Sequence, residues 1–264
     1  MTEENKAIPT QKRENIKHGY GWVADLPDHR DKMYSVHIPT PLPQIIDLRP
    51  MDSPIFDQLN LGSCTANSLA GALQFLEKKD KVKYMELSRL FIYYGERAIE
   101  DTVNSDSGAT IRDGIKTLAN LGVCSEKCWP YNISKFTVQP NHNCYIEAAK
   151  HKISSYYRLN TVDDMCHCLS SGYPFVFGFS VYESFESEEV TKTGIVPMPQ
   201  PDDQLLGGHA VVAIGYNYVD KRFLVRNSWG TSWGQKGYFS IPYQYLANRD
   251  LSDDFWTIRR GMNL

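Results

Sequence analysis

At residues 226–230 the chain reads Arg226-Asn227-Ser228-Trp229-Gly230, and this segment sets the expected fold of the second half. Asn227 closes a short apolar run, and an earlier apolar run, Ala210–Ile214, also predicts a strand. Residues 217–222 between the two runs are typical of a hairpin turn. Antiparallel pairing therefore places His209, at the start of the first strand, opposite residues near 227.

Cys64 begins an expected helix, directly after Gly62-Ser63. Backbone N–H groups and the helix dipole favour a thiolate there, so we expect a low thiol pKa and rapid alkylation. A histidine held by an asparagine amide can form an ion pair with that thiolate. Taken singly, Cys64 could be a buried helix-start cysteine, His209 a core histidine and Asn227 a turn residue.

Three motifs together resemble the papain-like cysteine peptidases. Gln58 stands six residues before Cys64, residues 207–211 read Gly-Gly-His-Ala-Val, and residues 227–238 read Asn-Ser-Trp-Gly-Thr-Ser-Trp-Gly-Gln-Lys-Gly-Tyr. Weaker matches occur at Gly108, at Trp129-Pro130-Tyr131 and at Gly194-Ile195. The resemblance runs from about residue 44 to the C-terminus.

The resemblance implies a role for each residue of this set. Cys64 would be the nucleophile, His209 the general base and acid, and Asn227 the residue that orients the imidazole. The side-chain amide of Gln58 and the backbone N–H of Cys64 would form the oxyanion hole.

On the substrate side, the resemblance implies that Gly108, Ala109, Ala210 and Trp229 bind the peptide. Gly108 and Ala210 would line the pocket for the residue two before the scissile bond. Trp229 would shield the hydrogen bond between asparagine and histidine from water.

Two positions near the nucleophile depart from the family pattern. Leu61 stands where secreted members commonly have a disulfide cysteine, which fits a reducing compartment. Thr65 replaces an aromatic residue and changes the expected primed-side wall. Ala109 also replaces the second glycine of a Gly-Gly pair.

Composition excludes several classes of protein. The net charge is -3, whereas a nucleic-acid binder usually carries an excess of basic residues. No apolar run approaches the roughly 18 residues of a membrane span, and the N-terminus lacks the apolar core of a secretory signal. We therefore expect a cytoplasmic, monomeric protein that acts on a peptide or protein substrate, with no nucleic-acid partner, no membrane and no cofactor.

The pattern of apolar residues predicts an α+β chain with a papain-like two-subdomain fold. Helical spacing dominates residues 64–120, and short β-rich runs follow. We expect an N-terminal arm at 1–44 and a peptidase domain at 45–264. Within that domain, a helical subdomain (about 60–150) and an antiparallel, barrel-like β subdomain (about 151–264) would enclose the active site in a cleft.

The arm, residues 1–44, is expected to be extended and to dock on the domain. Trp22, Leu26 and Tyr34 would be costly to leave in water, and Pro39–Pro43 resembles a polyproline connector. Two hypotheses remain open for the arm. It acts either as a clasp on the back of the fold or as a short propeptide that lies across the cleft and inhibits the enzyme.

Five cysteines other than Cys64 have no place in the expected chemistry: Cys124, Cys128, Cys144, Cys166 and Cys168. Their spacing is too wide for a common zinc pattern, so no metal site is expected. Free thiols are favoured over one or two disulfides, and a metal is the least favoured alternative.

Residues 183–203 carry six acidic side chains and one lysine. Such a segment is usually a solvated loop. Because it leads towards His209, an alternative is that it lies at the rim of the cleft and favours basic substrates.

The sequence leaves three functions to compare. An endopeptidase acting through an acyl-enzyme is favoured. A catalytically silent binding module is disfavoured because Gln58, Cys64, His209 and Asn227 are all present. An acyltransferase or peptide ligase would use the same residues and remains an alternative.

Overall fold

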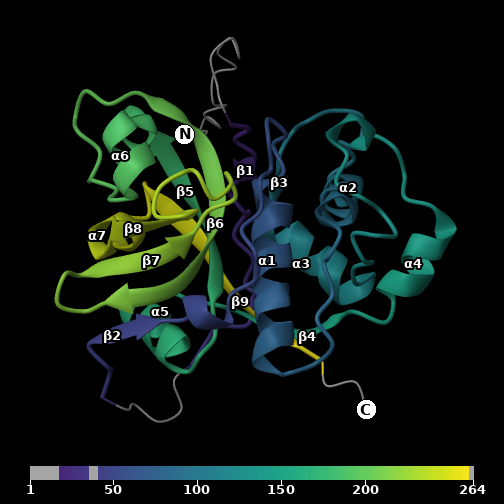
Figure 1. Cartoon of the computed structure of the whole chain (residues 1–264), viewed down its shortest axis with the longest axis horizontal. Coiled ribbons are helices and arrows are strands. Elements are labelled where there is room, and N and C mark those ends of the chain that lie inside the picture. Colours follow the sequence, from purple (N-terminus) through teal and green to yellow (C-terminus); the bar gives the residue numbers. More distant parts are fainter. Residues whose placement is uncertain (1–17, 36–40, 262–264) are drawn as a thin grey trace.

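The computed structural model describes residues 18–35 and 41–261, with helices α2, α3 and α4 on one side and a mostly antiparallel sheet, accompanied by short helices, on the other (Figure 1). Helix α1 lies between the two sides and contributes to both. The helical side contains α1 (Cys64–Lys79), α2 (Arg89–Ile99), α3 (Ile111–Asn120) and α4 (His142–Ala148). This arrangement confirms the expected α+β class.

The larger sheet has seven strands in the order β4-β9-β5-β6-β7-β8, with β2 paired to β6. Every neighbouring pair in it is antiparallel. The strands are β2 (Ile45–Asp47), β4 (Ile153–Arg158), β5 (Phe175–Tyr182), β6 (Leu205–Asn217), β7 (Arg222–Arg226), β8 (Tyr238–Pro242) and β9 (Ser252–Arg260). Separately, β1 (Trp22–Val23) pairs in parallel with β3 (Ala109–Thr110).

Helix α1 is the central element of the core. Its residues from Cys64 to Glu77 are all buried, so only its last turn reaches solvent. Lys78 and Lys79 lie in that last turn, where positive charge is favourable. Thr110 caps the start of α3, because its side chain accepts a hydrogen bond from the Asp113 N–H.

Short helices interrupt the strand-rich second half, which the sequence patterns did not predict. They are α5 (Val162–Ser170), α6 (Glu188–Thr193) and α7 (Tyr243–Ala247). Elsewhere in the described ranges, 3-10 turns occur at Arg49–Met51, Ile133–Lys135 and Glu183–Glu186. The signal for α5 was present, because Thr161 and Asp164 form a reciprocal capping box. Among the described residues, no helix is both long enough and apolar enough to cross a membrane.

The β6–β7 hairpin forms as the sequence predicts, with Asn217 paired to Arg222 across the turn. The register shifts between Ala213 and Gly215. Gly215 is required there because a Cβ would lie 2.3 Å from the Ile46 carbonyl oxygen of β2. The hairpin brings His209, within β6, and Asn227, the residue after β7, to the same end of the sheet.

A buried ion pair fixes the end of β7. The guanidinium of Arg226 lies 2.9 Å from the carboxylate of Asp52, and both side chains are 2% exposed. The same guanidinium donates to the carbonyl oxygens of Ser53 and Pro54. It also packs on Gly71, where a Cβ would come within 2.9 Å of Nε. This contact joins the sheet, α1 and the loop before Cys64.

We expect Arg226→Ala to lower the free energy of unfolding by about 3–5 kcal/mol, because it leaves the Asp52 carboxylate buried without a counter-charge. Chemical denaturation measures the change. Lys192→Ala is the matched control, since it removes an exposed ion pair with Glu188 and should cost at most about 1 kcal/mol. Equal losses in the two variants would contradict this account.

Candidate active site

Cys64 lies at the first position of α1 and is fully buried. The Ser68 hydroxyl donates to the Ala210 carbonyl over 2.8 Å and ties the start of the helix to β6. Burial raises the pKa of the Cys64 thiol to about 12, although backbone groups of Ala210 and Gly21 moderate the rise. The expected low pKa is therefore wrong for this state, since the arm covers the thiol and excludes water.

His209 and Asn227 meet as the hairpin predicts. His209 Nε2 lies 2.8 Å from Asn227 Oδ1, an acceptor, so Nε2 carries the proton. Burial lowers the pKa of His209 to about 3, although the Asn227 hydrogen bond opposes the shift. With these pKa values both the imidazole of His209 and the thiol of Cys64 are neutral near pH 7, so the expected ion pair is absent with the arm in place. Among the described residues, His209 Nδ1 has no hydrogen-bond partner.

Trp229 lies over the imidazole. Its ring stacks on His209 with centroids 4.7 Å apart and on His18 of the arm with centroids 4.2 Å apart. The ring of Tyr20, also in the arm, meets it edge-on at 6.3 Å. Trp229 is therefore buried between the predicted catalytic histidine and the arm.

Gln58 is buried, and its amide is already engaged. Nε2 donates to the Gly19 carbonyl of the arm over 2.8 Å and to the Leu61 carbonyl over 3.0 Å. Its Oε1 accepts from the Ser228 hydroxyl over 2.6 Å, which fixes the orientation of the amide. The predicted oxyanion donor thus holds a peptide carbonyl of the chain itself.

The predicted substrate-binding residues of β3 also contact the arm. The Ala109 N–H donates to the Gly21 carbonyl over 2.8 Å. Gly108 has a φ of 72°, and a Cβ there would lie 2.2 Å from the same carbonyl oxygen. Ala210 is opposite Gly178 in the β5–β6 pair.

Residues 19–23 of the arm pass between the helical side and the sheet (Figure 1). A Cβ on Gly21 would lie 1.8 Å from the Gly62 carbonyl oxygen, and one on Gly19 would lie 2.5 Å from the Leu61 carbonyl. Such distances are far inside van der Waals contact. Glycine is therefore required at both positions of the arm for this close approach to the loop before Cys64.

Trp22 fills a slot made by two glycines. Cβ atoms on Gly178 and Gly208 would lie 1.9 Å and 2.9 Å from its ring. The indole N–H donates to Asp254 Oδ2 over 3.0 Å. The same carboxylate oxygen accepts the backbone N–H of Asp25 over 2.8 Å. Asp254 has a φ of 57°, an uncommon value for a side chain other than glycine.

A charged cluster that the sequence analysis did not identify holds the next part of the arm. Arg112 and Arg158 both pair with Asp31, at 2.6 Å and 3.2 Å. Arg158 also pairs with Asp254 at 2.9 Å. The Trp256 indole donates to the buried carboxylate of Asp25 over 2.9 Å. The sequence signal was the number of aspartates in residues 25–31, but their partners are far away in the chain.

Not every expected anchor is buried. Leu26 is 81% exposed, so its expected burial is wrong. Its carbonyl accepts from Arg112 instead, which holds the backbone while the side chain faces solvent. Tyr34 packs against the core. In the expected polyproline connector, Pro39 and Thr40 lie outside the described residues.

The acidic segment 183–203 contacts the arm, because Glu186 accepts a hydrogen bond from the Tyr20 hydroxyl. Burial and the nearby carboxylate both raise the pKa of Tyr20. Glu186 therefore lies beside the same cleft, while its neighbours Glu188 and Lys192 remain exposed.

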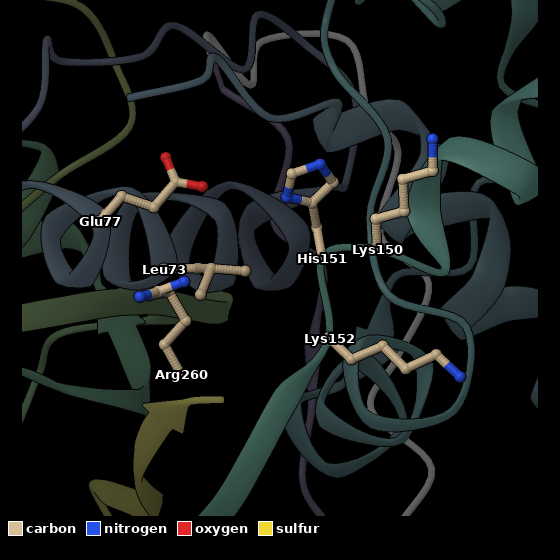
Figure 2. A pocket seen from close by; sticks show the side chains of 6 residues that line it. All are labelled: Leu73, Glu77, Lys150, His151, Lys152 and Arg260. Atoms are coloured by element: carbon tan, nitrogen blue, oxygen red, sulfur yellow. The ribbon is translucent and has the colours of Figure 1, made fainter. Parts of the chain in front are cut away.

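A separate hollow lies at the far end of α1. Figure 2 shows its lining, which comes from α1, from the segment before β4 and from the end of β9: Leu73, Glu77, Lys150, His151, Lys152 and Arg260. Burial raises the pKa of Glu77 to about 7. None of the predicted site residues lines this hollow.

Residues 42–252 match the model of the papain family cysteine proteases, and the chain belongs to this family. It is accordingly a cysteine protease, a hydrolase that acts on peptides or proteins. It is 44% identical to the peptidase C1-like protein L477 of Acanthamoeba polyphaga mimivirus, over 92% of this chain and 88% of that protein.

Solved structures support the same assignment. Xylellain, a cysteine protease from Xylella fastidiosa, superimposes with a TM-score of 0.89 at 43% identity, over 96% of this chain and all of that one. Procathepsin B from Trypanosoma congolense, at 20% identity, superimposes with a TM-score of 0.73 over 92% of this chain and 86% of that one and shows the shared fold.

Docking of the arm should weaken as the pH rises. Burial, with the charge of Asp25 adding to it, raises the pKa of Asp254 to about 7, and burial also raises that of Asp25. Arg112, Arg158, Asp31 and Asp253 are the other charges that face this pair. A raised carboxyl pKa means that docking binds a proton, so the stabilisation is present at low pH and lost as pH passes through about 7.

Hydrogen exchange of the amides in residues 19–25 tests this expectation between about pH 6 and about pH 8, after correction for intrinsic rates. Protection should fall across that range, and Asp254→Asn should flatten the dependence. Protection that rises with pH would contradict the assigned sign.

Proposed function

We propose that this protease cleaves peptide bonds through Cys64, His209 and Asn227, and that the arm inhibits it. One observation carries the proposal. The two donors that a substrate backbone would need, the amide of Gln58 and the N–H of Ala109, are bonded to carbonyls of Gly19 and Gly21. A peptide cannot use these donors until the arm leaves.

The chemistry follows from the protonation states. Once the arm leaves, water and the N-terminus of α1 stabilise a thiolate, and His209 Nδ1 accepts the Cys64 proton. The thiolate attacks the scissile carbonyl, and Gln58 and the backbone N–H of Cys64 stabilise the oxyanion. The imidazolium then protonates the leaving amine, and water activated by His209 hydrolyses the acyl-enzyme.

Each remaining residue has a supporting role in this proposal. Asn227 keeps the proton on Nε2, which leaves Nδ1 available to the thiol. Trp229 shields that hydrogen bond. Gly108 and Ala109 hold the substrate backbone where they now hold Gly21, and Ala210 lines the adjoining pocket. Residues 1–44 would be the inhibitory arm and 45–264 the peptidase domain.

Adding one methyl group at Gly21 tests inhibition by the arm, because that residue packs directly against Gly62. Gly21→Ala places a Cβ against the Gly62 carbonyl, and such overpacking typically costs about 1–3 kcal/mol. We expect kcat/KM for a peptide substrate to rise about tenfold or more.

Val23→Ala is the matched control for this prediction, because Val23 lies in the arm and is half exposed. It should leave kcat/KM near the wild-type value. A Gly21→Ala protein that is folded by thermal melting but no more active than wild type would mean that the arm does not block peptides.

The oxyanion role of Gln58 predicts a loss in turnover. In the Gly21→Ala background, Gln58→Ala should lower kcat about 100-fold with little change in KM, because the amide stabilises charge that forms only in the transition state. Cys64→Ala should abolish cleavage and supplies the baseline. An unchanged kcat in Gln58→Ala would leave this residue with a structural role only.

A further inference from the structure

Three thiols converge on the helical side. Cys124 follows α3, Cys128 lies four residues further on, and Cys144 belongs to α4. Their sulfur atoms all lie within 4.8 Å of one another, and those of Cys128 and Cys144 are 3.0 Å apart. The spacing along the chain concealed this cluster, because the intervening residues loop out and return.

The size of the cluster suits a cation. In a tetrahedral zinc site with bonds of about 2.3 Å, sulfur atoms stand roughly 3.8 Å apart. Shifts of well under an ångström would bring the three thiols to that spacing. Cys124 and Cys144 are fully buried, whereas Cys128 retains partial access through which an ion could enter.

Glu147 of α4 places a carboxylate beside Cys128, at the edge of this cluster. Burial alone would raise the pKa of Glu147, but hydrogen bonds from Ser125, and after them the Cys128 thiol, lower that pKa. The Ser125 N–H donates to Glu147 Oε1 over 3.1 Å and fixes the carboxylate. Asn141 Oδ1, 3.5 Å from the Cys144 sulfur, adds a second polar group around the thiols. Such outer contacts orient metal ligands.

We propose that Cys124, Cys128, Cys144 and the carboxylate of Glu147 bind a zinc ion. The three thiols release their protons to solvent, and the resulting thiolates and the carboxylate complete four-coordination. No oxidant is required. This site is separate from the proteolytic site, and the bound ion would stabilise the fold.

A zinc ion here would join α4 to the segment after α3. Two backbone hydrogen bonds hold that segment to the residues just before α2, from the Ser88 N–H to the Cys124 carbonyl over 2.9 Å and from the Glu126 N–H to the Glu86 carbonyl over 2.8 Å. Between Gly122 and Asn141 the chain forms one 3-10 turn and no longer helix or strand, so most of its backbone hydrogen bonds are those of local turns. A metal ion that links the two ends of such a loop stabilises the folded state.

A disulfide between Cys128 and Cys144 is the competing outcome. It would use two thiols and leave Cys124 and Glu147 without a role. The convergence of three sulfur atoms, with the Glu147 carboxylate beside Cys128, favours the cation.

The test uses the full chain with Cys64→Ala, so that the nucleophile cannot bind metal. The protein is purified with a phosphine reductant, stripped with a chelator and titrated with zinc against a chromophoric chelator. We expect one equivalent to bind and the melting temperature to rise. Cobalt should give a thiolate charge-transfer band.

Cys128→Ser should weaken zinc binding about 100-fold or more, since loss of a ligand should cost at least as much as loss of an outer partner. Cys166→Ser is the control, because that thiol lies near Tyr243, outside the cluster, and should change nothing. If Cys128→Ser fails to fold, Glu147→Gln tests the same site with every thiol retained.

Three results would overturn the proposal. One is the absence of bound zinc in the reduced protein. Another is zinc binding that persists unchanged in Cys128→Ser and Glu147→Gln. The third is a mass lighter by two hydrogens in protein purified without reductant, with peptide mapping that links Cys128 to Cys144.

Discussion

The active-site half of this structure depends on the close contact between the glycines of the arm and the loop before Cys64. Gly21 lies against the Gly62 carbonyl with no room for a methyl group. Because the backbone comes that close, Gly19 reaches the Gln58 amide and Gly21 reaches the Ala109 N–H. The same path carries Trp22 into its slot and Asp25 to the charged cluster.

This contact also sets the electrostatics of the site. With water excluded, the pKa of Cys64 rises and that of His209 falls, so both are neutral near pH 7. The groups arranged for an ion pair are held in the form that cannot attack. The arm would therefore inhibit the enzyme in two ways. It occupies the hydrogen-bond donors that a substrate backbone needs, and it suppresses formation of the Cys64 thiolate.

Sequence patterns predicted the parts that depend on neighbouring residues and known motifs. The β6–β7 hairpin, the helix that begins at Cys64 and the pairing of His209 with Asn227 all follow from local signals. The thiol pKa was wrong because it depends on burial by a distant segment. The hydrogen bond between Trp22 and Asp254 and the three-thiol cluster were not predicted for a related reason. Each joins residues that are far apart in the sequence and meet only in the folded chain.

The rate at which iodoacetamide alkylates Cys64 tests the central claim most directly, because the reagent is small and reports on the thiolate itself. The full chain would be compared with a chain that begins at Pro43, after both are shown to be folded. The account predicts slow alkylation in the full chain, fast alkylation without the arm, and slow alkylation again when a peptide of residues 18–35 is added. Equal, fast rates in the two chains would contradict it.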